Sequence, residues 1–195
     1  MKVDTLKAPK GAYRFVILIP HRDALRLIAE YRKMLFSDGF YGAYSFPLAA
    51  PLALVSRSFD RAELKELGRN IRNLTKEKDG KIVGSSAVQA NCPGGFSFFG
   101  PGLNLQLKED LFPASTKDKI LHILSPPVLC VTLLGSEKMP VSKEEPALSF
   151  RAASLANLTL RPLDNGAAGY SYEYYSYECY SYEWKIGPPV WLPGK

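Results

Sequence analysis

Two segments of the chain repeat their apolar residues at the spacing of one helical face. They run from Asp23 to Phe36 and from Asp60 to Lys76. In both, apolar side chains recur three or four positions apart and charged side chains occupy the positions between them, which is typical of an amphipathic helix with one buried face. We expect Asp23 to cap the first helix and Gly39 to end it. The pattern therefore predicts two amphipathic helices in the first half of the chain.

Other segments are short and apolar, or alternate apolar with polar residues, and predict strands. Residues 13–20 read YRFVILIP, a nearly continuous apolar run that predicts a strand buried on both faces. Residues 103–108 read LNLQLK and alternate strictly, which predicts a half-buried strand. Further strands are expected at Phe40–Phe46, Leu52–Ser56, Lys81–Ala90, Val128–Leu134, Leu148–Ala152 and Leu155–Leu163.

Two remaining segments have weaker patterns. The turn-rich stretch Asn91–Gly102 predicts a loop, and Ser115–Leu124 predicts a third, short helix with Ser115 at its N-cap. In each half of the chain, a strand and a helix are followed by several strands with few helices between them. This order predicts an α+β fold, in which residues 1–195 form a single domain with two similar lobes.

Residues 170–184 form a tyrosine-rich repeat that reads YSYEY, YSYEC and YSYEW. Tyr and Trp favour strands, but a five-residue unit conflicts with the two-residue period of a strand, so we expect a bulge or a turn in the middle unit. The repeat is interpreted either as an edge hairpin lengthened by duplication or as an aromatic surface that contacts bases or a protein partner. Its three glutamates argue against nucleic acid at this segment.

Composition and charge narrow the classes of function. The chain has 195 residues and a net charge of +6, from 25 Lys and Arg against 19 Asp and Glu. A mild basic cluster, interpreted as a solvated helix face and loop, contains Arg69, Arg72, Lys76, Lys78 and Lys81. No apolar run reaches about 18 residues, and the first residues lack the apolar core of a signal peptide. We therefore expect a cytoplasmic protein that does not enter a membrane.

Cysteines and histidines are too few and too scattered for most metal or catalytic sites. Cys92, Cys130 and Cys179 form no CxxC pair, and we expect reduced thiols, no metal and no cofactor. Phosphate-binding loops, nucleophile elbows and HExxH motifs do not occur in the sequence. His21 and His122 are thus the weak candidates for acid–base catalysis. Each also has a structural interpretation, His21 as a loop or cap residue and His122 as a half-buried helix residue.

Several stretches together resemble the 2H phosphoesterases, the family of the RNA 2′,5′-ligase-like proteins and cyclic nucleotide phosphodiesterases. The first half offers FVILIP and then FPLAAPLALVSRSFDRAELKEL, and the second offers LNLQLKEDLF, ILHIL and LCVTL. The closing stretches FRAASLANLTLRPL and YSYEWKIGPPVWL resemble the final hairpin of that family. The resemblance covers most of residues 13–192. It implies two pseudo-symmetric lobes whose antiparallel sheets form a concave cleft, with the helices outside.

The resemblance also implies where a site should lie and what it lacks. In that family, two strands each carry His-x-Thr/Ser, which puts an acid or base and a phosphate-binding hydroxyl on one face of the strand. Here the first motif has Pro51 and Ala53, and the second has Cys130 and Thr132, so both histidines are missing. A catalytically inactive relative is therefore expected, one that binds a nucleotide, an RNA end or another phosphorylated ligand. The expected cleft residues are Pro51, Ala53, Cys130, Thr132 and Arg57, with His21 as a further neighbour.

Two alternatives remain open at the level of the sequence. An active cyclic phosphodiesterase or RNA-processing enzyme could use His21 or His122 from displaced positions. A protein-interaction module could instead bind a protein partner through the tyrosine-rich residues 170–184. The three classes differ in what they require of the two histidines and of the repeat.

Overall fold

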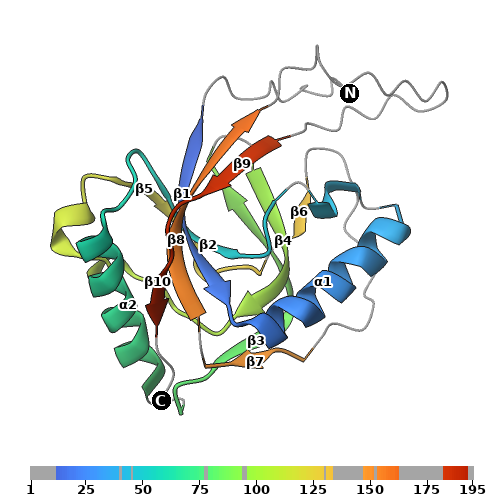
Figure 1. The fold of residues 1–195 in the computed structure, drawn as a ribbon, viewed down its shortest axis with the longest axis horizontal. Coiled ribbons are helices and arrows are strands. Elements are labelled where there is room, and N and C mark those ends of the chain that lie inside the picture. The colour runs from blue at the N-terminus through green and yellow to red at the C-terminus, as the bar shows by residue number, and fades with distance from the viewer. Residues whose placement is uncertain are drawn as a thin grey trace.

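A computed structural model describes residues 12–39, 41–44, 46–76, 79–93, 96–129, 131–133, 147–151, 153–162 and 182–192. They form an α+β fold in which helices α1 (Arg22–Ser37) and α2 (Arg61–Lys76) accompany two antiparallel sheets (Figure 1). The strands are β1 (Tyr13–Pro20), β2 (Ala50–Val55), β3 (Ile82–Cys92), β4 (Phe96–Leu103), β5 (Ile120–Ile123), β6 (Val131–Leu133), β7 (Ser149–Phe150), β8 (Ala153–Pro162), β9 (Tyr182–Ile186) and β10 (Val190–Leu192). Short 3-10 turns are η1 (Tyr41–Tyr44), η2 (Glu109–Leu111) and η3 (Ala114–Thr116).

The larger sheet has six strands, in the order β10-β8-β1-β2-β5, and β9 pairs with β8 beside β10. Its centre is β1, which pairs along its whole length with β8 and along most of it with β2. Four consecutive residues of β1, Phe15 to Leu18, have no exposed surface. The prediction of a strand buried on both faces is therefore confirmed.

Each face of β1 contributes to a different part of the core. Val16 and Leu18 belong to one apolar cluster with Leu67 and Ile71 of α2. On the other face, Phe15 belongs to a second cluster that includes side chains from both sheets. Because burial of each large apolar side chain contributes about 1.5–3 kcal/mol, covering both faces is a major source of stability.

Three aromatic rings connect the two sheets. Phe15, Phe46 and Phe98 of β4 meet edge to face, with ring centroids 6.0 Å apart for Phe15–Phe46, 5.7 Å for Phe15–Phe98 and 5.1 Å for Phe46–Phe98. Edge-to-face geometry is favourable because the positive edge of one ring meets the negative face of the next. This aromatic trio joins β1 to the smaller sheet, whose strand order is β6-β4-β3-β7.

The smaller sheet corrects two expectations of the sequence. Asn91–Gly102 is not a loop, because residues 96–103 form β4 and pair with both β3 and β6. Its Gly and Pro residues suggested a turn, but Phe98 and Phe99 are almost fully buried and hold the segment in the sheet. Residues 104–108 lie outside any strand, although Leu105 and Leu107 are buried as the alternation predicted.

Three further predictions are wrong in their local structure. Ser115–Leu124 holds η3 and then β5, which pairs with β2, so sheet pairing overrides the helical spacing. The expected strand Phe40–Phe46 contains the 3-10 turn η1, and its residues 40 and 45 lie outside the described residues. Asp23 does not cap α1, because His21 stands at the N-cap and makes no side-chain hydrogen bond there. Of the tyrosine-rich repeat, residues 170–181 also lie outside the described residues.

Hydrogen bonds fix the start of α2 to the rest of the fold. Asp60 and Glu63 form a capping box. The Asp60 side chain accepts the backbone N–H of Glu63 at 2.9 Å, and the Glu63 side chain accepts the backbone N–H of Asp60 at 2.7 Å. Lys119 Nζ also donates to both carboxylate oxygens of Glu63, at 2.6 Å to Oε1 and 2.8 Å to Oε2. Asn157 of β8 accepts the N–H of Phe59 and donates to its carbonyl. The helix therefore starts from a position set by two distant parts of the chain.

We predict that Lys119→Ala lowers the free energy of unfolding by roughly 3 kcal/mol, because it leaves the Glu63 carboxylate buried without its cation. The two side chains are only 16% and 8% exposed. The matched control is Arg57→Ala, which removes an ion pair with Asp118 whose side chains are 67% and 63% exposed. That change should cost less than about 1 kcal/mol. Urea unfolding followed by circular dichroism measures the free energy of unfolding of both variants. Equal losses of stability would contradict the claim that the buried ion pair contributes more than the exposed one.

Candidate functional site

The residues that the resemblance places in a cleft lie in different sheets. Pro51 and Ala53 are on β2, between β1 and β5, and both are buried. Ala53 has no exposed surface and belongs to the same apolar cluster as Val16. Thr132 is on β6 of the smaller sheet, where its backbone is opposite Phe98. Cys130 lies outside the described residues. Pro51 and Ala53 therefore contribute to the core at these positions.

Arg57 and the two histidines lie at separate places on the larger sheet. Arg57 follows β2 and forms its 2.5 Å ion pair with Asp118. His21 follows β1 and is exposed, with Nδ1 3.6 Å from Asp23 Oδ2. His122 is on the edge strand β5, opposite Leu54, and it is half-buried as predicted but not on a helix.

The sheet register determines how far apart the histidines are. Leu54 pairs with both His122 and Phe15, so His122 is level with the start of β1. His21 comes six positions after Phe15, which corresponds to about 20 Å of extended strand. General acid–base catalysis needs both groups within hydrogen-bond reach of one substrate. This register does not let His21 and His122 act together on one phosphate.

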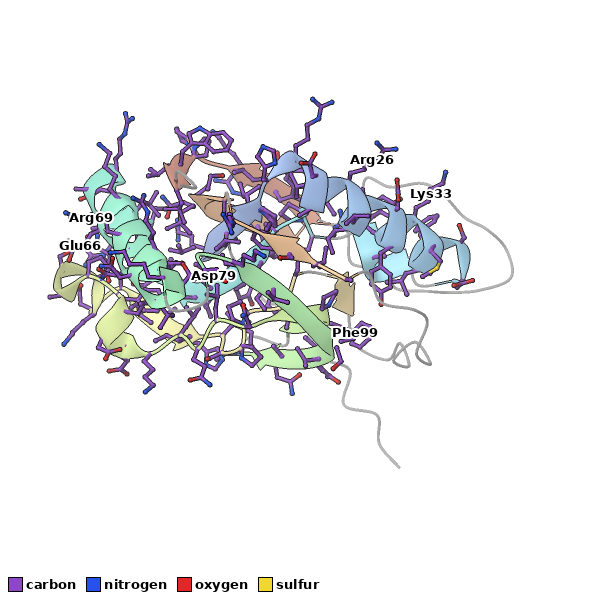
Figure 2. All side chains as sticks on the ribbon, turned by 90° about the horizontal axis from the view of Figure 1, so that it is seen from below. Arg26, Lys33, Glu66, Arg69, Asp79 and Phe99 are labelled. Carbon is purple, nitrogen blue, oxygen red and sulfur yellow. The ribbon has the colours of Figure 1, made fainter. Side chains whose placement is uncertain are left out.

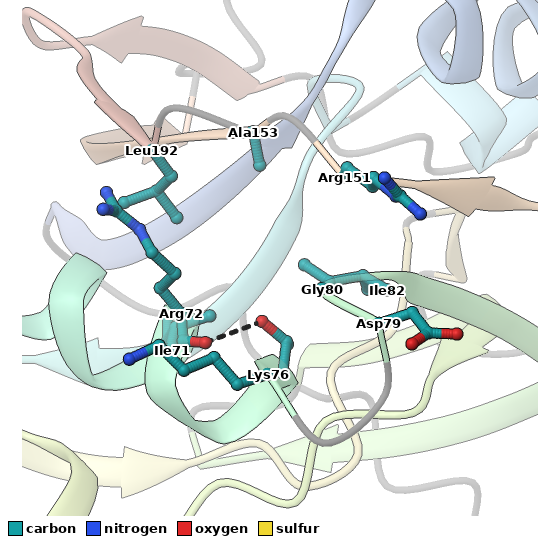
Figure 3. A pocket seen from close by; sticks show the side chains of 10 residues that line it. Ile71, Arg72, Lys76, Asp79, Gly80, Ile82, Arg151, Ala153 and Leu192 are labelled. Carbon is teal, nitrogen blue, oxygen red and sulfur yellow. Dashed lines mark hydrogen bonds between the residues drawn. The ribbon is translucent and has the colours of Figure 1, made fainter. Parts of the chain in front are cut away.

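A pocket of about 230 Å³ lies elsewhere, at the C-terminal end of α2 (Figure 3). It is enclosed by the last turns of α2, by the turn that follows, and by the ends of three strands. Its lining residues are Ile71, Arg72, Thr75, Lys76, Asp79, Gly80, Ile82, Arg151, Ala153 and Leu192. None of the residues predicted from the sequence as a site belongs to this lining.

Close packing and a tight turn shape the pocket. A Cβ atom added to Gly68 of α2 would overlap Leu192 Cδ2, so glycine allows the helix to approach β10 closely. After α2, Asp79 and Gly80 have φ angles of +53° and +68°, and the Gly80 N–H donates to the Thr75 carbonyl at 2.9 Å. The Thr75 hydroxyl donates to the Arg72 carbonyl at 3.1 Å (dashed in Figure 3). The helix thus ends in a left-handed turn directly beside the strands.

The chemistry of the pocket combines an apolar floor with positive charge. Ile71, Ile82, Ala153 and Leu192 supply apolar surface. The charged groups are Arg72, Lys76 and Arg151 against the single carboxylate of Asp79.

The three cations have no anionic partner in the described part of the chain. None of Arg72, Lys76 and Arg151 forms an ion pair with a described residue. The Nε atom of Arg72 is also buried, and no described group accepts its hydrogen bond. A buried donor without an acceptor is energetically costly, so an anionic ligand would be favoured here. The pocket fits an anionic group attached to an apolar body.

The sequence contained part of this site. Arg72 and Lys76 belong to the basic cluster of the sequence analysis, but no pattern in the sequence distinguishes Asp79 or Arg151. Arg151 lies more than 70 residues after α2 in the chain. Only the sheet topology, which puts the start of β8 beside β10, brings it to the helix. No spacing rule in the sequence could have found that contact.

Neither a cluster of metal-ligand residues nor a membrane-spanning helix is found among the described residues. Within the described ranges, no three His, Cys, Asp or Glu side chains gather as metal ligands would. The helices among those residues are also too short or too polar to span a bilayer.

Cys92 is a buried thiol at the end of β3. Burial raises its pKa to about 12. Tyr13 lies near it, and its pKa is also raised, first by burial and then by the charge that Cys92 would carry. Because the thiolate is the reactive form, Cys92 should be chemically inert in the folded protein.

We predict that Cys92 reacts with iodoacetamide at pH 8 roughly 1,000-fold more slowly than an ordinary thiol, because a pKa near 12 leaves so little thiolate. The measurement uses a Cys130→Ser, Cys179→Ser variant, so that mass spectrometry reports on this thiol alone. Unfolding the same variant in guanidinium should restore an ordinary rate. Fast alkylation of the folded protein would contradict the assigned burial.

Comparison with known proteins gives no support for a particular family. The chain matches no protein-family model, no curated protein and no solved structure. The resemblance to the 2H phosphoesterases therefore remains a prediction from the residues quoted for it. A fold alone does not identify an activity, so the function has to be argued from the chemistry of the pocket.

Proposed function

We propose that the protein binds an RNA end or a nucleotide, with the phosphate in the pocket at the C-terminal end of α2. One observation carries this proposal. Three cations, Arg72, Lys76 and Arg151, surround an apolar floor, and none of them forms an ion pair with a described residue. Arginine and lysine are the usual ligands of phosphate in proteins. An apolar floor suits the face of a base or a sugar.

A row of basic residues leads along α2 to the pocket. We call it the α2 basic row, and it consists of Arg61, Lys65, Arg69, Arg72 and Lys76. At 3.6 residues per turn, these positions fall within a sector of about 80°. Four of the five are exposed and Arg72 is half-exposed, and none has an ion-pair partner in the described ranges. Figure 2 shows Arg69 on the outer side of the helix.

The geometry of the α2 basic row suits a single strand of nucleic acid. From Arg61 to Lys76 the helix rises about 22 Å, with about 4.5–6 Å between successive cations. A single strand presents phosphates in a row, and a basic surface that follows its backbone is the usual way to bind it without sequence preference. The row ends at Arg72 and Lys76, which also line the pocket. We infer that the strand lies along α2 and that its end enters the pocket.

The proposal is one of binding without the acid–base pair of an active relative. His21 and His122 are about 20 Å apart along the sheet, and neither lines the pocket. We keep the resemblance to inactive 2H phosphoesterases as part of the proposal, with the larger and smaller sheets as its two lobes. The ligand site, however, moves from Pro51, Ala53 and Thr132 to the pocket beside α2. A cytoplasmic location, also proposed, would expose the protein to RNA ends.

We predict that the protein binds a 5′-phosphorylated RNA hexamer more tightly than the same hexamer with a 5′-hydroxyl. Replacing Arg72 and Lys76 by glutamine should remove this difference, because these side chains are assigned to the terminal phosphate. Arg61→Gln with Lys65→Gln should instead weaken both hexamers equally. This double variant should also make the negative slope of log binding constant against log salt concentration shallower by about 1.4, because each lost phosphate contact with a single strand contributes about 0.7. Fluorescence anisotropy at several salt concentrations measures all of these values.

The matched control replaces two cations of similar exposure on α1, Arg26→Gln and Lys33→Gln. Figure 2 places these side chains on the helix at the opposite side of the molecule from α2. Their loss lowers the net charge as much as the α2 variants do. If the α1 control weakens binding as strongly as the α2 variant, net charge alone explains the affinity and the proposed site is wrong.

A further inference from the structure

We infer that the pocket selects guanine, and that Asp79 is the residue that determines this specificity. The inference rests on the proposed function, because it names the base attached to the phosphate bound there. Asp79 is the one carboxylate among the described residues that line the pocket, whose other charged side chains are Arg72, Lys76 and Arg151.

Asp79 occupies a backbone conformation that glycine adopts more easily. Its φ of +53° is in the left-handed region, three residues after Lys76 at the end of α2. The bond from the Gly80 N–H to the Thr75 carbonyl is of the kind that closes a helix with a left-handed residue, and glycine is the usual residue there. Asp79 is exposed and has no ion pair with a described residue. The turn itself therefore does not require a carboxylate at this position.

The charged side chains stand on two sides of the pocket. Figure 3 places Arg72 and Lys76, from α2, on one side and Asp79 and Arg151 on the other. The first pair offers only donors, which suits a phosphate. On the second side, Asp79 offers two carboxylate acceptors and Arg151 offers the donors of a guanidinium. A ligand that satisfies both sides carries an anion at one end and a donor–acceptor edge at the other.

Guanine has the edge that matches the second pair. Its N1–H and N2 amino group are two adjacent donors that the Asp79 carboxylate could accept, and its neighbouring O6 is an acceptor that Arg151 could reach. Adenine has an unprotonated N1 on this edge. Its lone pair would repel the carboxylate of Asp79, because both groups are hydrogen-bond acceptors. Uracil has a single N–H donor there, and cytosine has an acceptor at N3. Among the four bases, guanine fits this pair of side chains best.

The floor and the size of the pocket agree with a single purine nucleotide. Ile82 and Ala153 provide apolar surface between the two charged sides. The volume of about 230 Å³ is smaller than the roughly 300–1,000 Å³ of sites for drug-sized ligands. One base with part of its sugar phosphate is the most that it can enclose. We therefore assign the pocket to the terminal guanosine of a strand whose remaining phosphates lie along the α2 basic row.

Isothermal titration of GMP, IMP and AMP tests the assignment. We expect the wild-type protein to bind GMP at least tenfold more tightly than AMP. IMP, which keeps N1–H and lacks the N2 amino group, should fall between them. In Asp79→Asn the ratio of GMP to AMP affinity should fall to about one, because GMP loses its carboxylate acceptor and AMP loses the repulsion at N1. Asparagine also accepts the left-handed conformation, so this variant should fold.

A second variant separates recognition from the structural role of the turn. Asp79→Gly relieves the backbone, so its melting temperature should rise, yet it should lose the preference for GMP as Asp79→Asn does. Equal binding of GMP and AMP by the wild-type protein, or an unchanged ratio in both variants, overturns guanine selection and leaves the proposed phosphate site standing. Failure of all three nucleotides and of the phosphorylated hexamer to bind overturns the proposed function together with this inference.

Discussion

The burial of β1 on both faces is the constraint on which the rest of the fold depends. A strand with four consecutive residues that have no exposed surface must be covered by apolar side chains from two directions. α2 covers one face, and the aromatic trio of Phe15, Phe46 and Phe98 attaches the smaller sheet on the other. The position of α2 is therefore a consequence of packing at the centre of the larger sheet, and the pocket at its end follows from that position.

The contacts that shape the pocket also hold α2 in place against the larger sheet. The bonds of Glu63 with Lys119 and of Asn157 with Phe59 fix one end of α2, and Gly68 lets the helix approach Leu192. Basic residues near a helix C-terminus also interact favourably with the helix dipole, which accounts in part for Arg72 and Lys76. The dipole does not account for Arg151, which comes from the sheet. Nor does it account for Asp79, whose negative charge is unfavourable at that end of a helix. These two residues are the ones that a ligand explains best.

The sequence predicted the elements whose burial is local and periodic. Tyr13–Pro20 and the two amphipathic helices are found within one or two residues of their predicted bounds, because continuous apolar runs and helical faces can be recognised in a short window. Asn91–Gly102 and Ser115–Leu124 were wrong, because long-range pairing decides their structure: β4 is held by two neighbouring strands and β5 by β2. The site was predicted least well. Its residues come from α2, from the turn at Asp79 and from the start of β8, and only the tertiary fold brings them together.

The central claim is that the ligand lies beside α2 and not between β2 and β6. The most direct measurement is a titration of isotope-labelled protein with GMP, followed by the backbone amide signals in two-dimensional NMR spectra. The account predicts that signals shift progressively at residues 71–76 and 79–82, at Arg151 and Ala153 and at Leu192, which line or adjoin the pocket. The signals of Ala53, His122 and Thr132 should stay in place. Shifts confined to Ala53, His122 and Thr132, with residues 71–76 and 79–82 unchanged, would contradict it.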